Sequence, residues 1–182
     1  MKTENRTLAK TGMIFFLISL TVLFGASIWG YVWVRSFREE AWLPEGFVFD
    51  RIGIYTSTVL ILLSSAFFFA SNFYFRKGEY SYYQIYFRIA FLFGIAFLGS
   101  QFHNWRELYE QNIRMDTKAL FSFCFYFLTG IHALHILGGI FPMSFVAFRP
   151  LSFRLSFLEN LEMYWHFLGM VWILLSLLFL FT

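Results

Sequence analysis

The stretch Ala119–Phe148, ALFSFCFYFLTGIHALHILGGIFPMSFVAF, carries no charged residue and decides the class of the fold. At about 1.5 Å of rise per residue, a helix of this length is longer than the roughly 30 Å hydrocarbon core of a bilayer. We therefore expect a membrane-spanning helix that is tilted, or that bends near Gly138, Gly139 and Pro142.

The composition of the whole chain supports the same class. Of 182 residues, 59% are hydrophobic and only 14% are charged, and the mean hydropathy is +0.62. A water-soluble domain of this size could not bury so much apolar surface, so the sequence predicts an integral membrane protein. The modest net charge of +3, without a compact basic face, argues against nucleic acid as a partner. The single cysteine, Cys124, excludes an intramolecular disulfide and a CxxC metal or redox site.

Four more uncharged or nearly uncharged stretches are long enough to cross a membrane. The loops between the stretches are short, which favours an up-and-down arrangement. We predict an all-α integral membrane bundle of five transmembrane helices in one domain, residues 1–182, with spans at about 11–35, 52–75, 82–106, 119–148 and 158–181.

Basic residues in the loops predict the orientation, because cytoplasmic loops are enriched in Lys and Arg. Five spans place the two termini on opposite sides of the membrane. The N-terminal side receives eight basic residues, Lys2, Arg6, Lys10, Arg76, Lys77, Arg88, Arg149 and Arg154, against six on the other side. The bias predicts a bacterial inner (plasma) membrane protein with a cytoplasmic N-terminus and a periplasmic C-terminus.

Two histidines, His132 and His135, lie three residues apart in the middle of the longest span, on one face of a helix. Polar side chains at that depth need a partner, which is either a haem or metal ion or a group within the bundle. Measured from the loop shared by the last two spans, His135 is about 20 Å deep and His166 about 12 Å deep. His103 lies near the opposite interface. The unequal depths favour hydrogen bonds within the bundle over a ligand pair.

Acidic residues are absent from the centres of the spans. Glu159 and Glu162 lie where the last span starts, a position that the helix dipole favours for acids, and Glu162 can pair with His166 four residues later. A proton pathway normally needs buried carboxylates. We therefore do not expect this chain to conduct protons by itself.

Arg149 and Arg154 flank the short loop before the last span. With Trp165 and His166, they could form a basic and aromatic pocket for an anionic lipid headgroup. The alternative is that both arginines only set the topology.

Two motifs resemble a known family. TGIHALH, Thr129–His135, matches the pattern Thr-Gly-x-His-x-x-His, and YWHF, Tyr164–Phe167, followed by Val171–Trp172, matches a Tyr-Trp-His-Phe pattern. Weaker matches include Gly12–Ser19, Gln101 with Trp105, and Glu159. On these residues the chain resembles subunit III of the haem–copper oxidases over nearly its whole length. The structural signature that results comprises Gly130, His132, His135, Glu159, Trp165 and His166.

The resemblance implies a five-helix form of a subunit that is better known with seven helices. It implies an accessory, non-catalytic subunit of a bacterial cytochrome c oxidase in aerobic respiration, without catalytic, cofactor-binding or metal-binding residues of its own. Haem and copper would lie in partner subunits. The chain would scaffold the catalytic subunit I, join subunit II and other respiratory-complex subunits, and bind structural phospholipids. The alternatives are an accessory subunit of a nitric oxide reductase or quinol oxidase, or a stand-alone membrane cytochrome b.

Three departures from the family pattern each remove an acid. The family often has a buried glutamate where this chain has Leu20, a glutamate in place of Asn104, and an aspartate where this chain has Leu168–Gly169. Any role that depends on the buried glutamate is therefore not expected here, and carbodiimide should not label the position of Leu20.

Overall fold

The computed structural model describes residues 2–37, 42, 51–114, 120–149 and 155–181, with side chains from Thr7 onward. These residues form five helices: α1 Lys2–Phe37, α2 Arg51–Lys77, α3 Tyr80–Glu110, α4 Leu120–Phe148 and α5 Leu155–Leu180. All five are long and apolar enough to cross a membrane. The predicted all-α bundle of five transmembrane helices is confirmed.

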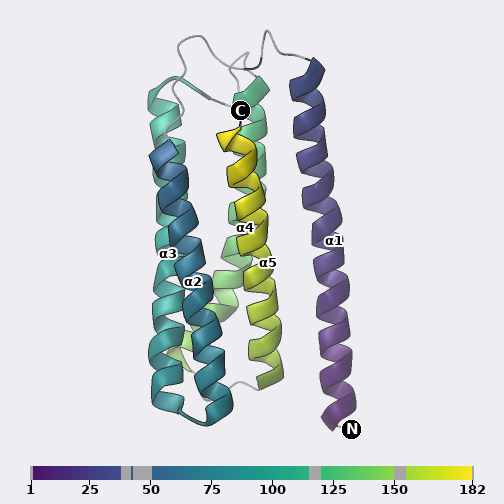
Figure 1. Cartoon of the computed structure of the whole chain (residues 1–182), viewed down its shortest axis with the longest axis vertical. Coiled ribbons are helices and arrows are strands. Elements are labelled where there is room, and N and C mark those ends of the chain that lie inside the picture. Colours follow the sequence, from purple (N-terminus) through teal and green to yellow (C-terminus); the bar gives the residue numbers. More distant parts are fainter. Residues whose placement is uncertain (1, 38–41, 43–50, 115–119, 150–154, 182) are drawn as a thin grey trace.

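The helices run up and down, and the two ends of the chain lie at opposite ends of the bundle (Figure 1). Helices α2, α3, α4 and α5 pack into a four-helix core, in which α2 pairs most extensively with α3. Helix α1 lies outside this core and packs mainly against α5 and α4. The first helix is therefore a peripheral element, although it is as apolar as the others.

A tight turn joins α2 to α3. Gly78 has a φ of +79°, a left-handed conformation that glycine adopts without strain. Its N–H donates to the carbonyl of Phe75, and the N–H of Glu79 donates to the carbonyl of Tyr74, each at 3.1 Å. This pair of bonds is a Schellman motif, which ends α2 and lets α3 start at once.

Glycines allow α5 to approach its neighbours closely. A Cβ added to Gly139 of α4 would lie 3.0 Å from the ring of Trp165, and one added to Gly94 of α3 would lie 2.9 Å from the same ring. Van der Waals packing at small residues is the main attraction between helices in a membrane, where the hydrophobic effect is absent. Gly139 therefore lets α5 come close to α4.

One residue of the connection between α1 and α2 is described, Trp42, and it packs against the bundle at the end where α1 stops and α4 starts. The ring of Trp42 lies 4.9 Å from that of Tyr31 in α1, and its carbonyl accepts a 3.2 Å hydrogen bond from the N–H of Phe121 in α4. Trp42 thus connects the end of α1 to the start of α4.

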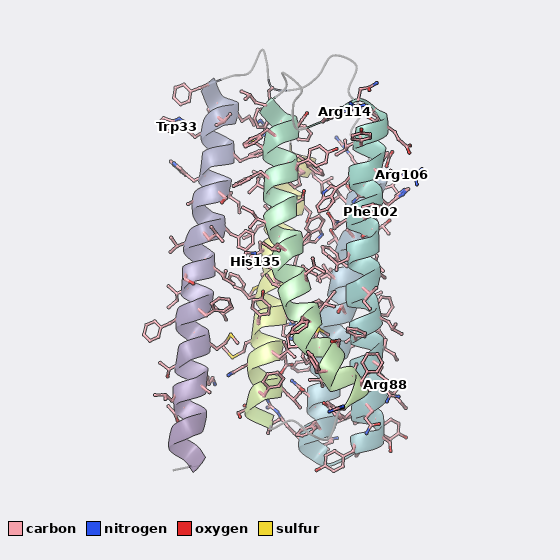
Figure 2. The ribbon with its side chains drawn as sticks, turned by 180° about the vertical axis from the view of Figure 1, so that it is seen from behind. Trp33, Arg88, Phe102, Arg106, Arg114 and His135 are labelled. Carbon is pink, nitrogen blue, oxygen red and sulfur yellow. The ribbon has the colours of Figure 1, made fainter. Side chains whose placement is uncertain are left out.

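Charged residues lie near the two ends of the bundle. Figure 2 shows Arg106 and Arg114 near one end and Arg88 near the other. The Arg88 side chain donates from Nε to the carbonyl of Ala147 at 3.2 Å, so it supplies a hydrogen bond to one of the last carbonyl groups of α4. Pro142 lies inside α4, and the C-terminal half of this helix leans away from α1 (Figure 2).

Candidate functional site

The tryptophan of the YWHF motif lies at the centre of the helix core. Trp165 is completely buried and donates from Nε1 to the hydroxyl of Ser64 in α2 at 3.0 Å. That hydroxyl in turn donates to the carbonyl of Ala90 in α3 at 2.7 Å. Because the ring also fills the space over Gly94 and Gly139, one side chain connects α5 to three other helices.

The same arrangement occurs twice more. Trp172 donates from its indole N–H to Thr58 of α2 at 3.1 Å, and Trp105 of α3 donates to Thr129 of α4 at 3.0 Å. Thr129 itself donates to the carbonyl of Phe125 at 2.6 Å. Each indole therefore reaches a hydroxyl on another helix, and no water is needed to satisfy it.

Three buried serines at seven-residue spacing hold α2 against α3, a polar pattern that the sequence analysis did not identify. Their partners in α3 are side chains or backbone carbonyls: Ser57 with Ser100 at 2.9 Å, Ser64 with Ala90, and Ser71 with Tyr83 at 3.2 Å. The signal that could have found them is the heptad spacing itself, which places polar residues on one face of a membrane helix.

The first signature histidine, His132, is surrounded by aromatic rings. Its ring centroid lies 6.1 Å from that of Phe24 in α1, 5.9 Å from Phe97 in α3 and 5.4 Å from Trp172 in α5. The side chain is fully buried, and neither ring nitrogen has a hydrogen-bond partner in the described part of the chain. The prediction that His132 bonds within the bundle is wrong, because three neighbouring helices each present an aromatic ring to it.

The second signature histidine, His135, does make a hydrogen bond. Its Nδ1 lies 2.8 Å from the carbonyl of Ile131 one turn earlier, so Nδ1 carries the proton. Figure 2 shows His135 near mid-height of the bundle, on the side of α4 that faces α1. Its backbone carbonyl accepts a 2.8 Å bond from the Tyr164 hydroxyl of α5. For His135 the prediction is confirmed, with its own helix as the partner.

Three positions of this chain lack an acid that the family pattern has, and at two of them, Asn104 and Gly169, a polar side chain lies close by. Asn104 donates to the hydroxyl of Ser57 at 3.3 Å, beside the 2.8 Å bond from Gln101 to the same hydroxyl. Gly169 lies against α2, since an added Cβ would be 3.3 Å from the Ser65 hydroxyl. Leu20 is buried and packs in the apolar core. The core at these positions is therefore assembled without carboxylates.

At its N-terminal end, α5 is held by polar contacts to two helices. Glu159 pairs with Arg76 of α2 at 3.2 Å, and Glu162 accepts a 2.7 Å bond from Asn72 of α2. Asn160 donates to the carbonyl of Ala9 in α1 at 3.2 Å. His166 lies 3.6 Å from Glu162, which confirms that predicted pair.

The residues expected to bind a lipid headgroup do not form one pocket. Arg149 is exposed at the end of α4, while Arg154 lies outside the described residues. The Trp165 ring cannot contact a headgroup at the surface, because the helix core covers it completely. The His166 side chain is one-third exposed, at 34%, and faces Glu162. Of the described residues among the four, Arg149 and His166 have side chains that are exposed or partly exposed at the surface.

A polar groove of about 520 Å³ opens between α1, α2 and α5 near this end of the bundle. Its lining combines charged, hydroxyl and apolar side chains: Thr7, Lys10, Thr11, Ile14, Arg76, Glu159, Glu162 and Met163. Among the described residues, no group of three or more His, Cys, Asp or Glu side chains could hold a metal ion.

Two signature or candidate residues lie apart from these clusters. Gly130 faces open space, since an added Cβ would meet no atom within 4 Å. His103 is exposed near the C-terminal end of α3. Neither contributes to the packing around Trp165.

No family model matches the chain. It is 30% identical over 181 residues to the cytochrome c oxidase subunit 3 of Thermostichus vulcanus, covering 94% of this chain and 86% of that protein. The chain belongs to the cytochrome c oxidase subunit 3 family. The subunit 3 of a Synechocystis species is 32% identical over 174 residues, covering 92% of this chain and 72% of that one. For the subunit 3 of Bacillus subtilis the identity is 26%, with 89% and 80% covered. The family resemblance of the two sequence motifs is confirmed.

Proposed function

We propose that this chain is the accessory subunit III of a bacterial haem–copper terminal oxidase, a cytochrome c oxidase of aerobic respiratory electron transport. The observation that carries the proposal is similarity over about nine-tenths of the chain to proteins named cytochrome c oxidase subunit 3. Five helices that are long and apolar enough to cross a membrane fit a subunit that works within the membrane.

The role is scaffolding, and the chemistry belongs to the partners. The polar groups around Trp165, Trp172 and Trp105 are hydroxyls that hold helices together, and they supply no acid or base. Haem and copper would be carried by the partner subunits, with subunit I as the catalytic one. This chain would bind subunit I, and subunit II and other respiratory-complex subunits would complete the assembly.

The orientation and the lipid contacts are part of the same proposal. The N-terminus would face the cytoplasm and the C-terminus the periplasm, as the loop charges predict. Structural phospholipid would bind near Arg149 and His166, which are accessible at one end of the bundle.

Purification of the tagged chain in a mild detergent tests the proposed function. We expect a complex whose visible spectrum contains haem and whose other subunits reduce oxygen. A chain that purifies alone and without any visible chromophore would contradict the proposal. Partners that reduce nitric oxide, or that oxidise quinol, would identify one of the alternative accessory roles.

The isolated chain separates the accessory role from that of a membrane cytochrome b. We expect no Soret band when the chain is stripped of its partners. A Soret band that disappears in His132→Ala or His135→Ala would assign a haem to this chain and overturn the proposed role.

A further inference from the structure

The imidazole of His135 presents an acceptor nitrogen that the described residues do not use. The side chain is half-buried, and its Nδ1 donates to the carbonyl of Ile131 at 2.8 Å. The proton on Nδ1 leaves Nε2 with a lone pair. No described residue donates a hydrogen bond to this Nε2. Unlike the ring nitrogens of His132, it is not enclosed by the fold, so a group outside this chain can reach it.

Contacts on three sides fix the position of this imidazole. The bond to Ile131 holds the ring against its own helix. Phe24 of α1 meets the ring edge-on, with the ring centroids 5.3 Å apart. The hydroxyl of Tyr164 in α5 donates to the backbone carbonyl of His135 at 2.8 Å. The acceptor is therefore held in place before anything binds to it, which lowers the entropic cost of binding.

The depth of His135 restricts what can donate to Nε2. The residue lies near the middle of the 29 residues of α4, at about mid-height of the bundle (Figure 2). Lipid headgroups lie about 15 Å away, at the surface of the roughly 30 Å hydrocarbon core. Acyl chains carry no hydrogen-bond donor. A polar side chain of another membrane helix can reach this depth, and pairing with one removes the cost of an unpaired acceptor in hydrocarbon.

The surface of α4 beside His135 has room for such a helix. Gly138 lies one turn after His135 on the same face and is exposed. A Cβ added there would meet only the Tyr164 hydroxyl, at an ordinary contact distance of 3.5 Å, whereas the neighbouring Gly139 is filled by the Trp165 ring. Leu134, one turn before Gly138, is 66% exposed. A small residue beside a polar one allows a second helix to approach closely and to form a hydrogen bond.

We propose that the face of α4 formed by Leu134, His135 and Gly138 binds a membrane-spanning helix of a partner subunit, and that a side chain of this helix donates a hydrogen bond to Nε2 of His135. The donor would be a hydroxyl or an indole N–H. Indole donors already join helices inside this chain, at Trp105 and Trp172. The inference rests on the proposed oxidase role, which supplies the partner, and it adds the surface and the chemistry of recognition.

Retention of partner subunits by the tagged full-length chain, measured as the detergent concentration is raised, tests the hydrogen bond. His135→Phe keeps a ring against Phe24 but removes the acceptor. It should weaken retention about threefold, the effect of one average hydrogen bond between membrane helices. His135→Gln supplies an amide oxygen and should restore most of the retention. His103→Phe is the matched control, because His103 is exposed on α3, and it should retain the partners like the parent chain.

A second pair of variants tests the close approach of the helices. Gly138→Leu should weaken retention about tenfold, because the larger side chain occupies the space that the partner helix needs. Gly99→Leu is the control, since Gly99 of α3 is also exposed and an added Cβ would meet no atom within 4 Å. Thermal unfolding of the two leucine variants should match that of the parent chain, which separates loss of the partner from loss of the fold.

A photo-reactive benzoyl-phenylalanine at Leu134 identifies the neighbouring molecule. We expect a cross-link to a membrane-spanning peptide of a partner subunit, with Ser, Thr, Tyr or Trp near the centre of that peptide. The same group at Leu92, which is 62% exposed on α3, should not cross-link to this peptide. A cross-link from Leu134 only to lipid, or to a quinol, would overturn the assignment to a helix.

The outcomes separate this surface from the oxidase role. Oxidase subunits that stay bound equally well to His135→Phe and Gly138→Leu would overturn the proposed surface and leave the oxidase role standing. A parent chain that purifies without any partner subunit would overturn both. Weak retention in Gly138→Leu with full retention in His135→Phe would overturn the hydrogen bond, because packing alone would then hold the partner.

Discussion

Helices α1 and α5 have similar apolar character but opposite positions in the fold. In the most apolar part of each span, 11% of α1 is buried, against 50% of α5. Helix α5 contacts all four other helices, with α3 reached through the rings of Trp165 and Trp172, whereas α1 packs mainly against α5 and α4. Hydropathy predicts that both helices enter the membrane, but it does not distinguish the helix that organises the core from the helix at the edge.

The glycines show the physical basis of this difference. Gly139 and Gly94 accommodate the ring of Trp165, so their lack of a side chain is used inside this chain. Gly25 and Gly30 of α1 face open space, where an added Cβ would meet no atom within 4 Å. Of these four glycines, the two in the core are used for close packing within this chain.

The largest expected effect comes from removing the residue at the centre of the core. Trp165→Ala should lower the free energy of unfolding by about 3–5 kcal/mol, because it leaves a cavity among four helices and removes the partner of Ser64. Trp33→Ala, at an exposed tryptophan of α1, should cost less than about 1 kcal/mol. Reversible unfolding in mixed micelles measures both. Equal losses of stability in the two variants would show that α1 is as important to the fold as α5.

A pair of glycine substitutions makes the comparison sharper. Gly139→Ala should cost about 1–3 kcal/mol, because the new methyl group meets the Trp165 ring at 3.0 Å. Gly25→Ala should be neutral or stabilise the chain by up to about 1 kcal/mol, since alanine favours the helix and meets no neighbour. Thermal unfolding of the two variants in one detergent is the measurement. A loss of partner subunits in Gly25→Ala without a loss of stability would place a partner on α1.

The hydrogen bond of Trp165 can be tested apart from its packing. Ser64→Ala removes the acceptor of the indole N–H and should cost about 0.6 kcal/mol, the average for such bonds between membrane helices. Ser27→Ala on α1 is the control, because within the described residues its hydroxyl bonds only to the carbonyl of Leu23 in its own helix. A cost above about 2 kcal/mol at Ser64 would mean that the bond, and not the packing, holds α5 in place.

The smallest effect is expected where α1 meets the core. His132→Phe should leave the free energy of unfolding unchanged or raise it by up to about 1 kcal/mol, because the imidazole is buried among rings and has no polar partner among the described residues. Unfolding measurements on His132→Phe and His135→Phe under the same conditions test this expectation. Destabilisation of His132→Phe by more than about 1 kcal/mol would show that the imidazole has a polar partner in the assembled protein.

Sequence reasoning predicted the helices well and their contacts less well. The five spans follow from uncharged length, and the pairing of Glu162 with His166 follows from a four-residue spacing on one helix. His132 and Trp165 were placed incorrectly, since a hydrogen-bond partner and a surface position both depend on which face of each helix turns inward. Asn72 was missed because its partner, Glu162, is 90 residues away in the sequence.

The sequence by itself therefore determines that this protein crosses the membrane five times and which family it belongs to. Both follow from local properties: uncharged runs that exceed the bilayer thickness, and short motifs within single helices. Only the tertiary structure decides that α5 lies in the core and α1 at the edge, and that Lys10, Arg76 and Glu162 share one groove. In a membrane the helices are nearly equal in hydrophobicity, so side-chain shape and a few hydroxyl partners select their arrangement.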